Sequence, residues 1–209
     1  MSRFRLLIFS KFPQPGKAKT RLIPALGAEG AASIQKHLTE KTAASALKLS
    51  QKMEVNIEFH FTGASLQEMI SWLGEGSYHP QLGNDLGQRM HSSFQRCFVD
   101  GAEKVVLVGS DIPGLNHQIL QEAMQRIDSQ TVSIGPSRDG GYYLLGLHHT
   151  MLPVLAQPLF TTIPWSSGDV FQLTSARVAD SGYRLHLLPE LLDIDLPEDL
   201  DQARLEGLM

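Results

Sequence analysis

The stretch LLIFSKFPQPGKAKTRL, residues 6–22, joins a short apolar run to a strongly cationic loop. Its first four residues, Leu6–Phe9, are all apolar, which predicts a buried strand. The loop that follows carries two prolines, Gly16 and four cations within eleven residues: Lys11, Lys17, Lys19 and Arg21. In an open α/β sheet, ligands bind beyond the carboxyl ends of the strands. A cationic loop at that place favours phosphate oxygens as ligands, although a solvated surface loop can have the same composition.

Strands and helices alternate along the rest of the chain. Apolar or alternating runs predict strands at 55–61, 78–82, 104–108, 131–134, 142–147 and 183–188. Helical spacing and capping residues predict helices at 28–50, 65–73, 85–100, 116–127, 166–178 and 197–205. The pattern predicts one α/β domain over residues 1–209, a three-layer α/β/α sandwich with a mostly parallel sheet. An antiparallel strand at 142–147 remains an open alternative.

The composition is that of an ordinary globular protein. The 209 residues are 42% hydrophobic and 19% charged, with a net charge of −4, so the cationic first loop stands out against an acidic background. This balance argues against binding to duplex DNA or to a membrane surface. There is no signal-peptide pattern and no apolar run of membrane-spanning length, and we expect a cytoplasmic protein. Cys97 is the single cysteine, which excludes an intrachain disulfide and fits a core position.

Asp111 is the first candidate for metal chemistry. It follows the apolar run Val105–Val108, and Gly109 between them allows a ligand to approach the backbone closely. Mg²⁺ in proteins takes oxygen ligands, commonly one or two carboxylates together with substrate phosphates. The alternative is that Asp111 only caps the following helix. We favour the metal, because the cationic loop would lie at the same edge of the sheet.

Three further segments carry polar groups of interest. In the segment 135–144, Asp139 precedes two glycines and could accept hydrogen bonds from sugar hydroxyls, bind a metal or act as a general base; the alternative is the corner of a β-turn. In the segment 81–90, Gln81, Asp85 and Arg89 flank a predicted helix start, where backbone amides can receive an anion. A carboxylate just before the last helix, Asp195 or Asp193, could be a second metal ligand or a helix cap.

Several common motifs are absent from the sequence. The P-loop pattern fails because Gly16-Lys17 is followed by Ala18 and no earlier glycine has the required spacing. The dinucleotide fingerprint is missing from the first loop, and there is no Gly-x-Ser-x-Gly elbow. The histidines lack the spacing of zinc ligands.

Taken in order, these segments resemble the DUF2064 family of small bacterial proteins with a nucleotide-diphospho-sugar transferase fold. Some members of that family are labelled arsenosugar-biosynthesis glycosyltransferases. The resemblance covers nearly the whole chain through KxPxPGxxKTRL (11–22), QxGxDLGxRM (81–90), GxDxP (109–113), GPxxDGGY (135–142), IPWS (163–166) and DID (193–195).

The resemblance implies a Rossmann-like GT-A fold and assigns roles to matching positions. Lys11, Lys19 and Arg21 would face the nucleotide phosphates, Asp111 would bind Mg²⁺ or Mn²⁺, and Asp139 would lie near the acceptor. We also expect Gly16, Gln81, Asp85 and Arg89 at the nucleotide, and Asp195 as the second metal ligand. The sequence departs from the Asp-x-Asp motif common in GT-A enzymes, because Ser110-Asp111-Ile112 offers a single carboxylate.

These features predict a metal-dependent glycosyltransferase that uses a nucleotide-diphospho-sugar donor and a small-molecule acceptor. A nucleotidyltransferase of the guanylyltransferase kind, joining an NTP to a phosphorylated small molecule, would use the same loop and metal. A nucleotide-binding regulatory protein without catalysis is the third alternative. The sequence does not name the base, the sugar, the acceptor or the oligomeric state.

Overall fold

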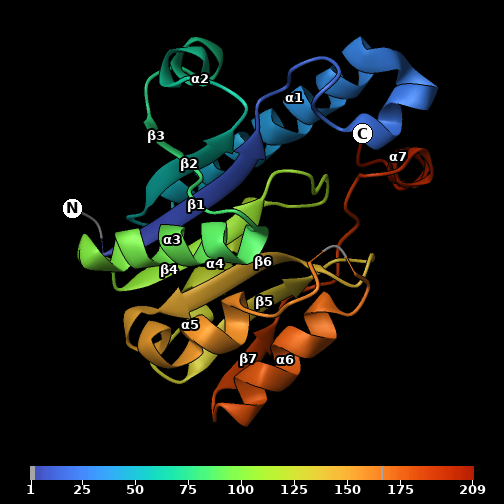
Figure 1. The fold of residues 1–209 in the computed structure, drawn as a ribbon. Coiled ribbons are helices and arrows are strands. Elements are labelled where there is room, and N and C mark those ends of the chain that lie inside the picture. The colour runs from blue at the N-terminus through green and yellow to red at the C-terminus, as the bar shows by residue number, and fades with distance from the viewer. Residues whose placement is uncertain (1–2, 166) are drawn as a thin grey trace.

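The structure is a computed structural model that describes residues 3–165 and 167–209. Its centre is a seven-stranded sheet in the order β3-β2-β1-β4-β6-β5-β7 (Figure 1). The strands are β1 (Phe4–Lys11), β2 (Asn56–Thr62), β3 (Ser77–Pro80), β4 (Lys104–Gly109), β5 (Thr131–Pro136), β6 (Tyr142–His148) and β7 (Arg184–Leu187). Only β6 runs antiparallel to its neighbours, β4 and β5, which decides the alternative that the sequence left open.

Helices cover both faces of this sheet, as predicted. They are α1 (Ile23–Ser50), α2 (Leu66–Leu73), α3 (Leu86–Val99), α4 (His117–Arg126), α5 (Leu152–Phe160), α6 (Val170–Asp180) and α7 (Pro197–Leu205). Two short 3₁₀ turns, η1 (Thr20–Leu22) and η2 (His149–Met151), precede α1 and α5. Neighbouring residues of a strand point to opposite faces, so Leu6 and Leu7 enter two different cores.

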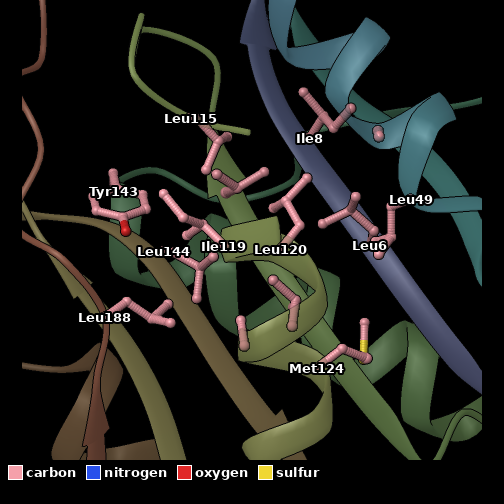
Figure 2. Packing of buried hydrophobic residues seen from close by; sticks show 14 of the residues in the cluster. Leu6, Ile8, Leu49, Leu115, Ile119, Leu120, Met124, Tyr143, Leu144 and Leu188 are labelled. Atoms are coloured by element: carbon pink, nitrogen blue, oxygen red, sulfur yellow. The ribbon is translucent and has the colours of Figure 1, made fainter. Parts of the chain in front are cut away.

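The first core lies between the sheet and the helices α1 and α4. Figure 2 shows Leu6 and Ile8 of β1 beside Leu49 of α1, with Leu120 and Met124 of α4 packed against them. The second core lies on the other face and joins Leu7 to Phe94 of α3, Leu155 of α5 and Val178 of α6. Burial on both faces explains why β1 and β4 read as continuous apolar runs.

Local sequence signals place most helix ends. Ser65 caps α2 in a reciprocal capping box with Glu68, and Asp85 and Asn116 cap α3 and α4 through their side chains. The predicted helix from residue 28 is the main part of α1, because Gly27 has φ 70° and ψ 170° and breaks the helical path there.

Two details differ from the sequence-based expectation. The helix α5 was not predicted, because Pro153 and Pro158 interrupt its pattern; the fold accepts them because helix α5 buries Leu155, Leu159 and Phe160. The helix expected to start near 166 begins at Val170 with Asp169 at its N-cap, and Ser166 lies outside the described residues.

The parallel strands bring their carboxyl ends to one edge of the sheet. The loops after β1, β4 and β5 and the start of β6 therefore meet at the point where the strand order reverses, between β1 and β4. Within the described residues, no helix combines the length and the apolar character needed to span a bilayer.

Candidate active site

A cleft of about 580 Å³ opens at this edge of the sheet. Most of its polar lining comes from three segments: the first loop, the end of β4 and the loop that enters β6. A fourth segment, 193–195, precedes α7 and runs beside the others. The backbone amide of Ile194 donates to the carbonyl oxygen of Asp111 at 3.0 Å, and that of Arg138 donates to the carbonyl oxygen of Leu191 at 3.1 Å.

Lys19 links the first loop to the floor of the cleft. Its backbone is left-handed, with φ 45° and ψ 48°, an unusual conformation for a residue other than glycine. Its side chain is only 6% exposed, and its Nζ lies 3.3 Å from Asp111 Oδ2 and 3.8 Å from Asp195 Oδ1. The ammonium group is therefore buried beside two carboxylates at the point where the loop meets the end of β4.

The other cations of the first loop lie closer to solvent. Lys11, Lys17 and Arg21 are exposed and line the cleft, and Arg21 also forms an ion pair with Asp195. Gly16 does not appear in the lining; with φ 77° it provides the turn that sends the loop back toward the sheet.

Closely packed neighbours position Asp111. A Cβ added to Gly109 would lie 2.9 Å from Asp111 Oδ1, so the absence of a side chain at position 109 leaves room for the Asp111 carboxylate. Beneath it, Ser110 belongs to a buried cluster in which Gln35 Nε2 donates to Thr39 Oγ1 at 3.1 Å and Thr39 Oγ1 donates to Ser110 Oγ at 3.3 Å.

Asp193 carries the most perturbed carboxyl group of the cleft. Burial raises its pKa, and the negative charges of Asp139 and Asp111 raise it further, to about 7. Asp195, which we predicted as a metal ligand, forms ion pairs with Lys19 and Arg21, and its role at a metal stays a prediction. Within the segment 193–195, the charges of Asp139 and Asp111 act on Asp193, whereas Asp195 pairs with the cations.

Asp139 occupies the turn that the sequence offered as its alternative role. Its Oδ1 accepts hydrogen bonds from Ser137 Oγ at 2.6 Å and from the Gly141 amide at 2.8 Å. The same carboxylate is exposed and lines the cleft, so the turn holds it there.

Of the three residues predicted in the segment 81–90, only one lines the cleft. Gln81 lines the cleft, and its Nε2 donates to the carbonyl oxygens of His60 at 2.8 Å and Ser10 at 3.4 Å. Asp85 caps α3 by accepting from the Gln88 amide at 2.8 Å, and Arg89 donates to the Gly83 carbonyl at 3.0 Å. Neither Asp85 nor Arg89 is among the residues that line the cleft, so their assignment to the nucleotide has no support from this geometry.

One wall of the cleft is apolar and aromatic. Most of this wall was not predicted, because its residues come from distant elements. Trp165 packs so closely over the start of α3 that a Cβ added to Gly87 would lie 2.8 Å from its ring. We name this surface the apolar wall and define it as Leu86, Met90, Tyr142, Leu145, Trp165 and Val170.

The oxygen ligands of the cleft suit a hard divalent cation. The negative charges of Asp139 and Asp111 add to the cost of ionising the buried Asp193, and a divalent cation held among these carboxylates would relieve that repulsion. In the described part of the chain, the group whose ligand atoms lie within 4.8 Å of one another is elsewhere: Glu58, His60 and Cys97. That group does not suit a metal, because Arg5 and Arg96 already pair with Glu58 and burial raises the pKa of Cys97 to about 12.

Comparisons with known proteins agree with the fold and with the sequence motifs. The model of a family described as an uncharacterized protein conserved in bacteria (DUF2064) matches residues 43–167. The chain is similar to a solved structure from Desulfovibrio desulfuricans, provisionally assigned as a nucleotide-diphospho-sugar transferase. The identity is 32%, with 96% of this chain and 86% of that chain covered, and the TM-score is 0.87.

More distant structures share the fold. A nucleotidyl transferase from Methanothermobacter is 17% identical over 98% of this chain and 97% of its own, with a TM-score of 0.67. A 4-diphosphocytidyl-2C-methyl-D-erythritol synthase from Anaerococcus prevotii is 10% identical over 99% and 96%, with a TM-score of 0.63. No curated protein matches the sequence.

Proposed function

The chain belongs to the DUF2064 family, and from that premise we propose that it is a metal-dependent glycosyltransferase. The donor is a nucleotide-diphospho-sugar and the acceptor is a small molecule. The similar protein from Desulfovibrio desulfuricans carries a matching provisional assignment, which supports this choice of donor.

One observation carries the proposal. Lys19 of the first loop and Asp111 at the end of β4 lie 3.3 Å apart in the wall of one cleft. The cationic loop and the carboxylate thus line the same pocket, which supports their proposed roles in binding a diphosphate and a divalent cation. Had they lain on different faces of the molecule, the proposal would have no basis.

The residues of the cleft divide the chemistry between them. Lys11, Lys19 and Arg21 would bind the diphosphate oxygens, and Asp111 with Asp193 or Asp195 would hold Mg²⁺ or Mn²⁺, which would supply positive charge for the leaving diphosphate. Cations aimed at those oxygens stabilise the transition state more than the ground state, because negative charge grows there as the glycosidic bond breaks.

The transfer exchanges one bond for another. The acceptor oxygen forms a bond to the anomeric carbon, and the bond from that carbon to the diphosphate oxygen breaks. The electron pair leaves with the nucleoside diphosphate, and the acceptor proton passes to a carboxylate of the cleft. Asp139 suits this last role, because the turn 137–141 fixes it in the lining.

Nucleotidyl transfer is the second candidate. A solved nucleotidyl transferase matches the fold over 98% of this chain, and the cations of the first loop would serve a triphosphate equally well. The released product separates the two reactions: a nucleoside diphosphate indicates glycosyl transfer, and pyrophosphate indicates nucleotidyl transfer.

The experiment is a screen of nucleotides and nucleotide-sugars by thermal shift, with and without Mn²⁺, followed by product analysis of each stabilising ligand. Binding that needs Mn²⁺ and yields a nucleoside diphosphate supports the proposal. Tight binding without any dependence on the metal, and without turnover, points to a regulatory nucleotide-binding protein instead.

Variants of the two central residues test the assignment directly. We expect Asp111→Asn and Lys19→Ala each to lower turnover by about 100-fold or more, the scale seen when one stabilising group of a polar site is removed. The matched control is Lys48→Ala, an exposed cation of α1 outside the cleft. Unchanged turnover in either central variant removes that residue from the catalytic machinery.

A further inference from the structure

The charges of the cleft are distributed unevenly between its two ends. Among the lining residues that the structure describes, every lysine and arginine comes from the first loop: Lys11, Lys17, Lys19 and Arg21. The lining from the turn 137–141, from β6 and from the approach to α6 contributes the carboxylate of Asp139 and no cation.

Tyr142, on the β6 side of the apolar wall, lies away from the end of β1, where the first loop begins. The strand β4 separates β6 from β1, and neighbouring strands lie about 4.8 Å apart, so Tyr142 starts on the order of 10 Å from the end of β1. The wall is one packed surface, because Met90, Leu145, Tyr142 and Trp165 belong to the same hydrophobic cluster.

The wall also offers surface to a ligand. Leu86 is 44% exposed although it lines the cleft, and Tyr142 and Trp165 are half-buried. Because both aromatic residues line the cleft and are only half-buried, part of their apolar surface is accessible to a ligand, and removing water from such surface is favourable.

We infer that the acceptor is a molecule without phosphate, uncharged or cationic, whose apolar body lies on the wall formed by Tyr142, Met90 and Trp165 while its hydroxyl group faces Asp139. This inference rests on the proposed function and narrows its acceptor class. A phosphorylated acceptor would bring a dianion beside Asp139, into the part of the lining that has no cation, which like-charge repulsion disfavours. The same argument disfavours the transfer of a nucleotide to a sugar phosphate.

Tryptophan fluorescence can report on the wall alone. The chain has two tryptophans, and Trp72 lies on α2, where its indole donates to Glu40. The substitution Trp72→Phe leaves Trp165 as the single reporter. The probes are three molecules of similar shape: benzyl alcohol, benzylamine and phenyl phosphate, each titrated in the presence of Mn²⁺ and inorganic pyrophosphate.

We expect saturable quenching by benzyl alcohol or benzylamine, at least ten-fold tighter than by phenyl phosphate. The substitution Ser167→Lys adds a cation beside Trp165 and should shift this preference at least ten-fold toward phenyl phosphate, whereas Ser167→Ala should leave it unchanged. Binding of phenyl phosphate that equals or exceeds that of the other probes overturns the inference, and so does the absence of any saturable response.

Calorimetry of pyrophosphate with Mn²⁺ separates this inference from the proposed function. That titration probes the donor end without assuming a base or a sugar. Normal pyrophosphate binding together with failure of the aromatic probes rejects the acceptor class alone. Failure of pyrophosphate to bind rejects the donor site on which both proposals depend.

Discussion

Lys19 shows how a single side chain can join two parts of a site. Its left-handed backbone turns the loop so that a long side chain reaches inward from a region rich in exposed cations. Such a conformation costs of order 1 kcal/mol or more and persists only where the surroundings enforce it. Here the ion pairs with Asp111 and Asp195 supply that enforcement. The strain therefore lies at the point where the proposed chemistry needs a fixed charge.

Asp193, again a single residue, should make the stability of the protein depend on pH. Its pKa in the folded protein, about 7, exceeds the unfolded value of 3.8, so the folded state binds the proton more tightly. Its contribution to stability is fully present below about pH 4 and is lost as the pH rises toward 7 and above. Asp193→Asn should therefore stabilise the metal-free protein by about 2 kcal/mol at pH 8 and change it little at pH 4. Urea unfolding at both pH values measures this.

Asp193→Asn should also weaken the binding of the metal, although it raises the stability of the metal-free protein. We expect Asp193→Asn to reduce the thermal shift produced by Mn²⁺ with pyrophosphate, because one oxygen ligand loses its charge. Asp180→Asn, on the exposed end of α6, is the control. A variant that is not stabilised at pH 8 would show that Asp193 is ionised without cost, contrary to its surroundings.

At the scale of elements, the turn between β5 and β6 is fixed by its contact with the segment before α6. Gly140 has φ 86°, and a Cβ on it would lie 2.0 Å from the carbonyl oxygen of Gly168. The Gly140 carbonyl in turn accepts from the Phe171 amide at 2.9 Å. The position of Asp139 thus depends on α6, which lies thirty residues farther along the chain.

Two glycine substitutions separate backbone strain from this contact. Gly182 has φ 82° and open space where a Cβ would lie, so Gly182→Ala should cost about 1 kcal/mol, the strain of the left-handed backbone alone. Gly140→Ala adds the clash with Gly168 and should cost about 2–4 kcal/mol. Thermal unfolding measures both; equal costs would mean that the turn and the segment before α6 move apart freely.

The contact between β1, β2 and α3 rests on a buried ion network around Glu58. Burial alone raises the pKa of Glu58, but hydrogen bonds from His60, Arg96 and Arg5, with the charge of Arg96, outweigh burial and hold the pKa at about 2. Since this value lies below the unfolded value of 4.5, the group stabilises the fold above pH 4.5. That contribution, on the order of 3 kcal/mol, should be lost as the pH falls from 4.5 toward 2.

Glu58→Gln tests this network. It leaves Arg5 and Arg96 without their shared carboxylate and should lower stability by about 3 kcal/mol at pH 7. Its stability should then fall less steeply than that of the natural protein between pH 4.5 and 2. Parallel acid unfolding curves for the two proteins would contradict the assignment.

At the scale of the whole molecule, one sheet carries both cores and the cleft. The hydrophobic clusters on the two faces share the strands β1, β4 and β6. Neither cluster can therefore unfold without disrupting strands that also carry the other. We propose that residues 1–209 form one cooperative domain. The cleft belongs to the same unit, because its lining comes from both halves of the chain.

Calorimetry tests whether the chain unfolds as one cooperative domain. A single transition is expected, with equal calorimetric and van 't Hoff enthalpies. A ligand at 100 times its dissociation constant should stabilise the whole transition by about 2.7 kcal/mol, and a chain of this length gains about 2–4 °C in Tm per kcal/mol. Two transitions, of which the ligand shifts only one, would divide the chain into two domains.

The sequence alone determined those parts of the fold and site that depend on local interactions and on the general geometry of parallel sheets. The strands β1 and β4 were readable because burial on both faces demands unbroken apolar runs, and Ser65 and Asp85 marked helix starts because unpaired amides need acceptors. The first loop and Asp111 were readable as partners because parallel strands bring their carboxyl ends to one edge. The family followed from motifs spread over nearly the whole chain.

The tertiary structure decided what depends on contacts between distant segments. It turned β6 antiparallel, kept α5 helical despite two prolines, and paired Asp195 with the cations while the charges of Asp139 and Asp111 act on Asp193. It also left Asp85 as a cap outside the cleft. A two-residue spacing in sequence fixes neither which way a carboxylate turns nor what it meets, because both depend on the packing of the segment 191–195 along β5 and the Asp111 loop.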